Sequence, residues 1–230
     1  MTDFYKLTGE QGEAIHGGSG TWPLPTADGP GDWLTAAGPL VPCENGLHVL
    51  RREHVLFEWI GPVLWRVEVD AAGLIEDATK CVVARARLIE RVEPWNPVTL
   101  RLFAADCAER ALWRERAAGR EPDPRSWEAV RVAREATHGR AQAAAAGAAR
   151  DAAWAAAASA WAADAADAAE AAQATAGAAD AAEAARDAAW AAGAAARDAE
   201  RTWQRDRLWT YLDGRTPAPV TSNDEKARTP

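Results

Sequence analysis

At residues 141–199 the chain reads AQAAAAGAARDAAWAAAASAWAADAADAAEAAQATAGAADAAEAARDAAWAAGAAARDA. About two-thirds of this stretch is alanine, and none of it is proline. Alanine has the highest helix propensity because its side chain loses no rotamer freedom in a helix, so the stretch predicts helix. One uninterrupted helix would extend about 89 Å at 1.5 Å per residue, which is implausible for a chain of 230 residues. We therefore expect a fold-back near Gly177, where a glycine can end a helix, with arms at residues 142–175 and 178–212.

Two further helices are predicted ahead of this hairpin. Asn96-Pro97 and Asp123-Pro124 each join a residue that caps a helix N-terminus to a proline suited to the first helical position. Apolar residues at helical spacing follow both signals. The two helices are expected at residues 98–118 and 124–138. With the hairpin they predict an alanine-rich antiparallel four-helix bundle over residues 97–214, followed by a polar tail, 215–230, that we expect to be disordered.

The first 93 residues have a different pattern. Alternating or continuous apolar runs bounded by glycine and proline predict strands. The clearest strands are expected at residues 4–8, 46–50, 63–69 and 80–92, with a short helix at 53–60. Residues 1–93 therefore predict a small α+β domain. The expected fold class of the chain is α+β, a small N-terminal α+β domain followed by the helical bundle.

Composition excludes several classes of function. The formal net charge is −8 and no long run of lysine and arginine occurs, which argues against nucleic-acid binding because phosphate neutralisation dominates that affinity. Charges interrupt the alanine stretch every few residues, so we expect no membrane span, and no signal-peptide pattern occurs at the N-terminus. Three cysteines at irregular spacing do not form a disulfide framework, which favours the cytoplasm. The richness in alanine and arginine is typical of high-GC genomes such as those of actinobacteria and their phages.

Candidate chemistry in the first domain is confined to His16, Cys43 and His48. Cys43 and His48 have Cys-x4-His spacing, and Cys81 could supply a fourth ligand. Structural zinc sites usually show closer cysteine pairs, so we expect no metal and no cofactor. A catalytic Cys–His pair is disfavoured in the same way, because neighbours in sequence need not meet in space.

Candidate partner-binding residues lie in the second half. Asp106 and Arg110 lie on the first predicted helix, where they pair locally or anchor a neighbouring helix or a partner. Trp161, Asp164 and Asp167 lie on the alanine-rich stretch at helical spacing. The acids there form either a solvated face or a docking surface for a basic partner. Trp161 fills either the core of the hairpin or the centre of a partner surface.

Two family resemblances follow from short motifs. The segments FYKLT at 4–8, HGG at 16–18, PCENGLH at 42–48 and LWRVEV at 64–69 look like an uncharacterised N-terminal domain of phage and bacterial proteins. The segments AADCAERAL at 104–112, PDPR at 122–125 and WEAVRVAR at 127–134 resemble the immunity-protein family of bacterial toxin–immunity loci. That second resemblance implies an all-helical domain that binds a toxin. The family carries histidines in its last helices, whereas no histidine follows His138 here.

The first functional hypothesis is therefore a non-enzymatic protein-binding module. Its helical half would bind a protein partner, such as a toxin or a phage or host factor, and the helices also allow a homo-oligomer. The rival hypothesis is an enzyme or metal-binding module with a site around His16, Cys43 and His48. A third reading is a structural helical spacer.

Overall fold

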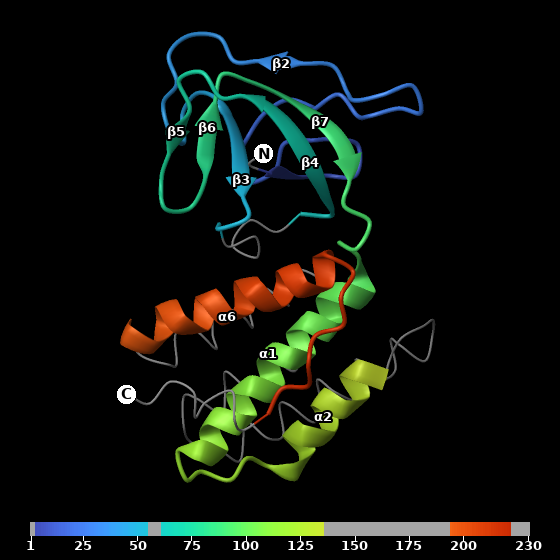
Figure 1. Ribbon diagram of the computed structural model, residues 1–230, viewed down its shortest axis with the longest axis vertical. Helices are drawn as coiled ribbons and strands as arrows, with labels where there is room; N and C mark the ends of the chain where they lie inside the picture. Colours follow the sequence, from blue (N-terminus) through green and yellow to red (C-terminus); the bar gives the residue numbers. More distant parts are fainter. Residues whose placement is uncertain (1–2, 55–60, 136–193, 222–230) are drawn as a thin grey trace. The chain divides into compact units, whose positions relative to one another are not determined.

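A computed structural model describes residues 3–54, 61–135 and 194–221, with the side chains of 194–198 excepted (Figure 1). The chain divides into two compact units, Met1–Trp95 and Asn96–Pro230. We call them the sheet unit and the helical unit and describe each by itself.

The sheet unit is a single antiparallel sheet of seven strands (Figure 1). The strands are β1 (Phe4–Thr8), β2 (Leu34–Thr35), β3 (Leu47–Arg51), β4 (Val63–Asp70), β5 (Ile75–Glu76), β6 (Cys81–Val83) and β7 (Arg85–Arg91). Their order across the sheet is β2-β7-β4-β1-β3-β6-β5. The predicted strands at residues 4–8, 46–50 and 63–69 are therefore confirmed, with small shifts at their ends. The first strand of the chain, β1, lies in the interior of the sheet between β3 and β4.

The predicted strand at residues 80–92 is instead two strands, β6 and β7, separated by Ala84. In the sheet these two strands are separated by β3, β1 and β4. Across a flat sheet that separation would be about 19 Å, since neighbouring strands lie about 4.8 Å apart. Val83 and Arg85 are only two residues apart, so the chain spans at most about 7.6 Å between them. The sheet must therefore curl until β6 and β7 meet at Ala84, which no sequence alternation reveals.

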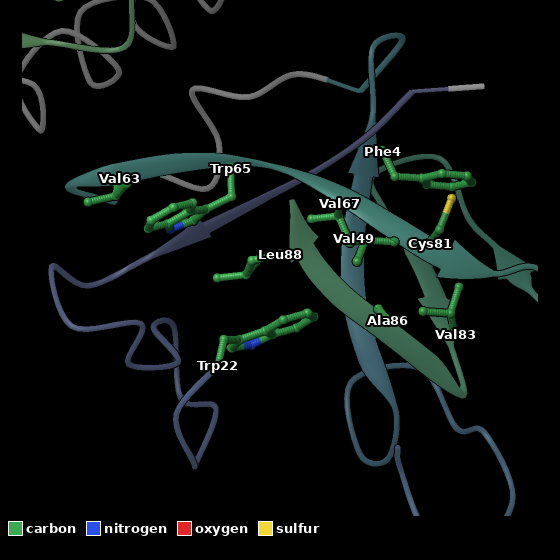
Figure 2. Close-up of a cluster of buried hydrophobic side chains, with 10 residues drawn as sticks. All are labelled: Phe4, Trp22, Val49, Val63, Trp65, Val67, Cys81, Val83, Ala86 and Leu88. Carbon is green, nitrogen blue, oxygen red and sulfur yellow. The ribbon is translucent and has the colours of Figure 1, made fainter. Parts of the chain in front are cut away.

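The curled sheet encloses the core of this unit (Figure 2). Trp22, which comes from the long loop between β1 and β2, belongs to the same buried cluster as Leu88 of β7. The Trp65 indole Nε1–H donates to Thr8 Oγ1 over 2.8 Å, so the ring is buried without an unpaired donor. The whole cluster consists of Phe4, Trp22, Val49, Val63, Trp65, Val67, Cys81, Val83, Ala86 and Leu88.

The expected α+β character of this unit is wrong. Among its described residues, 3–54 and 61–95, the regular elements are all strands. The predicted short helix at 53–60 falls almost entirely on residues 55–60, outside the described part. Turns rich in glycine and proline connect the strands, and the curl of the sheet buries most of the apolar residues of the described segments, although Ile89 of β7 stays exposed.

The helical unit contains three described helices, α1 (Pro97–Ala117), α2 (Pro124–Glu135) and α6 (Ala194–Leu212). Both predicted start signals are confirmed. Asn96 Oδ1 accepts hydrogen bonds from the backbone N–H groups of Val98 and Thr99, and Asp123 Oδ1 accepts one from Arg125 N–H over 2.8 Å. These bonds satisfy N–H groups that lack partners within the helix.

The helix α1 packs against both α2 and α6 (Figure 1). Small alanines on α1 let α2 approach closely, and the buried cluster between them is Ala104, Ala105, Ala108, Ala111, Leu112, Val130 and Ala133, with Trp127 packed against it. After α6 the chain continues as coil to residue 221. Val220 is buried there, and the Ala218 carbonyl accepts a hydrogen bond from Arg207 Nη1 over 2.6 Å.

The predicted four-helix bundle is the second correction to the fold class. The described residues contain three helices, no helical bundle is evident among them, and the antiparallel sheet is the dominant element. The predicted fold-back at Gly177, the first hairpin arm, 142–175, and residues 178–193 of the second arm lie outside the described part, whereas residues 194–212 of the second arm form α6. High alanine content predicts local helix, but alanine buries too little apolar surface to determine which helices pack together. Of the helices in the described residues, none combines the length and the apolar character that a bilayer span requires.

Candidate functional site

The sheet unit contains a cavity of about 570 Å³. Its walls come from β1, β3, a loop at residues 14–22 and a loop that includes residues 43–46. The cavity brings together the three candidates chosen from the sequence, His16, Cys43 and His48, and adds Lys6 and Lys80. Its volume lies within the range of small-molecule binding sites, about 300–1,000 Å³.

Two of these residues have an uncommon backbone conformation. His16 has φ 60° and Cys43 has φ 67°, and they are the only non-glycine residues with positive φ in the described part of the chain. A nearby glycine holds the second loop close to the sheet: Gly46 has φ 130°, and a Cβ there would lie 2.3 Å from Val82 Cγ1. Positive φ in residues with a side chain costs free energy and is concentrated at functional sites. Both such residues line the same cavity.

His48 holds the Cys43 loop through its imidazole. The Cys43 backbone N–H donates to His48 Nε2 over 3.1 Å, so Nε2 is an acceptor and the neutral ring carries its proton on Nδ1. Burial, with the charges of Lys80 and Lys6 adding to it, lowers the pKa of His48. His48 therefore holds the backbone of Cys43, and because its Nε2 accepts this bond, that nitrogen is not available as a base for the Cys43 thiol.

The Cys43 sulfur instead faces a lysine. Lys80 Nζ lies 3.0 Å from Cys43 Sγ, and Cys43 is exposed. The backbone N–H of Lys80 donates to Asp77 Oδ1 over 3.0 Å. This bond holds Lys80 just before β6, from where its side chain reaches Cys43. An exposed free thiol therefore lies beside a cation in the lining of the cavity.

Lys6 is the residue that sequence reasoning missed. Strand alternation places it on the same face of β1 as Phe4 and Thr8, directly opposite Trp65 of β4. Its ammonium lies 5.4 Å from the centroid of the Trp22 ring. Burial, and secondly the charge of Lys80, lowers the pKa of Lys6 to about 8. Among the described residues, no hydrogen bond or carboxylate partner is found for its amine.

A signal for Lys6 was present in the sequence. In the segment FYKLT at residues 4–8, a lysine occupies the centre of an apolar strand. A strand in the interior of a sheet buries such a residue, but only the pairing with β3 and β4 shows that β1 is an interior strand.

Cys81 does not lie where the sequence prediction placed it, in one group with His16, Cys43 and His48. Cys81, considered there as a fourth ligand, lies with His54 and Glu76, and their ligand atoms are within 4.8 Å of one another. Arg51 already supplies a cation to this group: its Nη1 lies 3.2 Å from Glu76 Oε2. The backbone N–H of Arg51 donates to His54 Nδ1 over 2.9 Å, so Nε2 of the neutral ring carries the proton and has no lone pair for a metal. The hydrogen bonding therefore fits an internal Arg51-centred cluster better than a metal site.

Asp106 and Arg110, the candidates on α1, are buried and paired within the helical unit. Asp106 accepts hydrogen bonds from Arg134 Nη2 over 2.7 Å, from Arg207 Nε over 2.7 Å and from Tyr211 Oη over 2.6 Å. Arg110 Nε donates to Glu200 Oε2 over 2.7 Å. Each therefore joins α1 to α6, and Asp106 also joins it to α2.

The guanidinium of Arg110 also lies over the Trp203 ring, 4.4 Å from its centroid. The local pairs predicted along α1 are thus replaced by pairs between helices. The remaining candidates, Trp161, Asp164 and Asp167, lie outside the described residues.

Comparison with protein-family models, with curated proteins and with solved structures found no match for this chain. The resemblances to an immunity-protein family and to a phage and bacterial N-terminal domain stay predictions.

Proposed function

We propose that the sheet unit binds a small anionic molecule in the cavity around Lys6 and Lys80. This proposal develops the rival sequence hypothesis, which placed a site around His16, Cys43 and His48. The observation that carries it is the amine of Lys6, which is desolvated beside the Trp22 ring and has no carboxylate partner in the described residues.

A buried cation without a counter-ion is costly, because burial removes its hydration and nothing replaces it. With a pKa of about 8, Lys6 is still mostly protonated at neutral pH. The nearby charge of Lys80 adds to the cost, and Asp77 offsets part of the Lys80 charge. A ligand carboxylate or phosphate would supply the missing negative charge. Charge-assisted hydrogen bonds of this kind are stronger than neutral ones.

The geometry supports a small ligand rather than a macromolecule. The site is a concave cavity with a volume typical of small-molecule sites, and Trp22 provides an aromatic wall beside Lys6. Because Cys43 is exposed at the rim as a free thiol, a reducing compartment such as the cytoplasm suits this proposal.

Calorimetric titration with inorganic phosphate and with pyruvate tests the proposal. We expect both anions to bind, and Lys6→Met and Lys80→Met each to weaken binding about tenfold, since a lost charge-assisted hydrogen bond costs about 1.5 kcal/mol. Lys226→Met is the matched control, because it removes the remaining lysine of the chain. Equal affinity of all four proteins for both anions would overturn the proposal.

The protein-binding hypothesis for the helical unit stays a second proposal. Its charged candidates Asp106 and Arg110 have partners inside the unit, so it depends on Trp161, Asp164 and Asp167. No described residue favours it over the cavity.

A further inference from the structure

Lysine is rare in this chain. Lysine and arginine together number 26, yet lysine occurs only at positions 6, 80 and 226. Two of these three lysines line one cavity. Arginine carries the positive charge almost everywhere else, and it differs from lysine in one chemical respect that matters here: it does not lose its proton in proteins, whereas lysine can become a neutral amine.

We propose that Lys6 is an imine-forming amine that reacts with a small carbonyl compound bearing a carboxylate or phosphate. This inference rests on the proposed anion site and names its substrate class. The amine reaches the cavity from an interior strand, and the Trp22 ring covers one side of it. An amine in such a position can attack a carbonyl carbon held in the same cavity.

The surroundings of Lys6 favour the neutral, nucleophilic amine. Imine-forming lysines are activated by desolvation or by a neighbouring cation, and both causes act here: burial is the larger and the charge of Lys80 the second. With a pKa of about 8, about a tenth of the amine is neutral at pH 7. The neutral fraction of an ordinary lysine is on the order of 100-fold smaller.

Lys80 has a separate role in this arrangement. Its ammonium lies close enough to Lys6 and His48 to lower the pKa of both, and it would pair with the anionic group of the substrate. Binding that group places the carbonyl beside Lys6, whose amine attracts the anion in its protonated form and reacts in its neutral form. Because Cys43 Sγ lies 3.0 Å from Lys80 Nζ, an anionic group paired with Lys80 would lie next to this thiol.

The reaction balances without an oxidant or a reductant. The Lys6 nitrogen lone pair adds to the carbonyl carbon, and the carbon–oxygen π electrons move to oxygen, which is protonated. The resulting carbinolamine loses that oxygen as one water molecule, and the nitrogen–carbon double bond forms. Starting from the neutral amine, one proton taken from solvent gives the protonated imine.

Reductive trapping tests the inference on the full chain. The protein is incubated with glyoxylate or pyruvate and sodium cyanoborohydride at pH 7, and the adduct is located by intact mass and peptide mapping. We expect one adduct, at Lys6, formed at least about tenfold faster than at Lys226, given the larger neutral fraction. Lys80→Met should slow trapping by weakening anion binding, and unfolding in urea should abolish the preference for Lys6.

The variant Lys6→Arg separates this inference from the proposed anion site. Arginine keeps the charge but cannot form the imine, so Lys6→Arg should retain phosphate binding and lose the adduct. If the parent protein binds phosphate but the trapped adduct shows no preference for Lys6 over Lys226, the imine proposal is overturned and the anion-site proposal is retained. If the parent protein does not bind phosphate, both the anion-site proposal and the imine proposal are overturned. The site of the adduct in the parent decides the question even if the variant fails to fold.

Discussion

The two units bury charged side chains in opposite ways. In the helical unit Asp106 is buried against two arginines and a tyrosine, and Arg110 against Glu200 and Trp203. In the sheet unit Lys6 faces a cavity, an aromatic ring and a second lysine. Asp106 and Arg110 thus have oppositely charged partners inside the protein, whereas Lys6 has no carboxylate partner among the described residues.

This difference separates a structural cluster from a candidate site. A buried charge with internal partners stabilises one arrangement of helices, and its removal leaves those partners uncompensated. A buried charge without them costs stability, and a bound ligand can recover that cost. The same residue types thus have different roles in the two units, and the partners decide which.

The largest expected effect comes from Asp106→Ala. The substitution leaves Arg134, Arg207 and Tyr211 without their shared acceptor, so the free energy of unfolding of the helical unit should fall by about 3–5 kcal/mol. Urea denaturation followed by circular dichroism at 222 nm measures it. Glu128→Ala is the control, because its pair with Arg131 is exposed and such pairs contribute little. Equal denaturation midpoints for the two variants would contradict this prediction, because the Asp106 cluster would then contribute no more to stability than an exposed ion pair.

The next effect has the opposite sign. Lys6→Met replaces a buried cation with an apolar side chain of similar length, so the sheet unit should become more stable by about 2 kcal/mol at pH 7. The gain should be constant below pH 8, because Lys6 is then protonated in both states. It should shrink between pH 8 and pH 10.5, because the native protein releases its proton first and the unfolded chain still binds one. Thermal melts over pH 6–11 measure this, and a gain that persists at pH 11 would contradict the burial of the charge.

A smaller effect is expected at mildly acidic pH. Burial lowers the pKa of His48 and of His54 from the usual 6.5, and in the neutral form both rings accept backbone N–H bonds. As the pH falls, the unfolded chain therefore binds protons at a higher pH than the native protein. The stability that these neutral histidines contribute to the sheet unit is fully present above pH 6.5 and decreases as the pH falls below it. Melting temperatures from pH 7.5 to pH 4.5 should show this decrease.

The double variant His48→Gln with His54→Gln should flatten the same profile. The glutamine carbonyl still accepts a hydrogen bond, but it does not titrate. Asp77, whose pKa is lowered chiefly by the backbone N–H of Thr79, contributes only below its usual value of 3.8, so its effect falls outside the tested range. An unchanged slope in the double variant would assign the acid sensitivity to other groups.

Local signals in the sequence predicted local structure well. The caps at Asn96 and Asp123 are present, and the alternation over residues 63–69 predicts β4. These features depend on interactions within a few residues. The choice of His16, Cys43 and His48 by residue type also identified three side chains that the fold brings to one cavity.

Features that depend on distant pairing could not be predicted in this way. Lys80 reaches the cavity because β6 pairs with β3, and Lys6 is partly buried on an interior strand, β1, that pairs with β3 and β4. The acceptor role of Asp106 toward Arg207 and Tyr211 spans more than 100 residues. The predicted fold class was wrong for a related reason. Alanine content predicts helix from neighbouring residues, whereas the sheet that dominates the described residues depends on the pairing of distant strands.

The interior position of β1 has a consequence for synthesis on the ribosome. Phe4 pairs with Arg51 of β3 and with Val67 of β4, so one edge of β1 stays unpaired until β3 has been made and the other until β4 has been made. At about 5–20 residues per second, the delay between Phe4 and Val67 is about 3–13 s. During that time the sheet around the segment FYKLT cannot be completed, and pairings this distant in sequence form slowly. The nascent chain of this protein should therefore depend on chaperones until the curl of the sheet can close at Ala84.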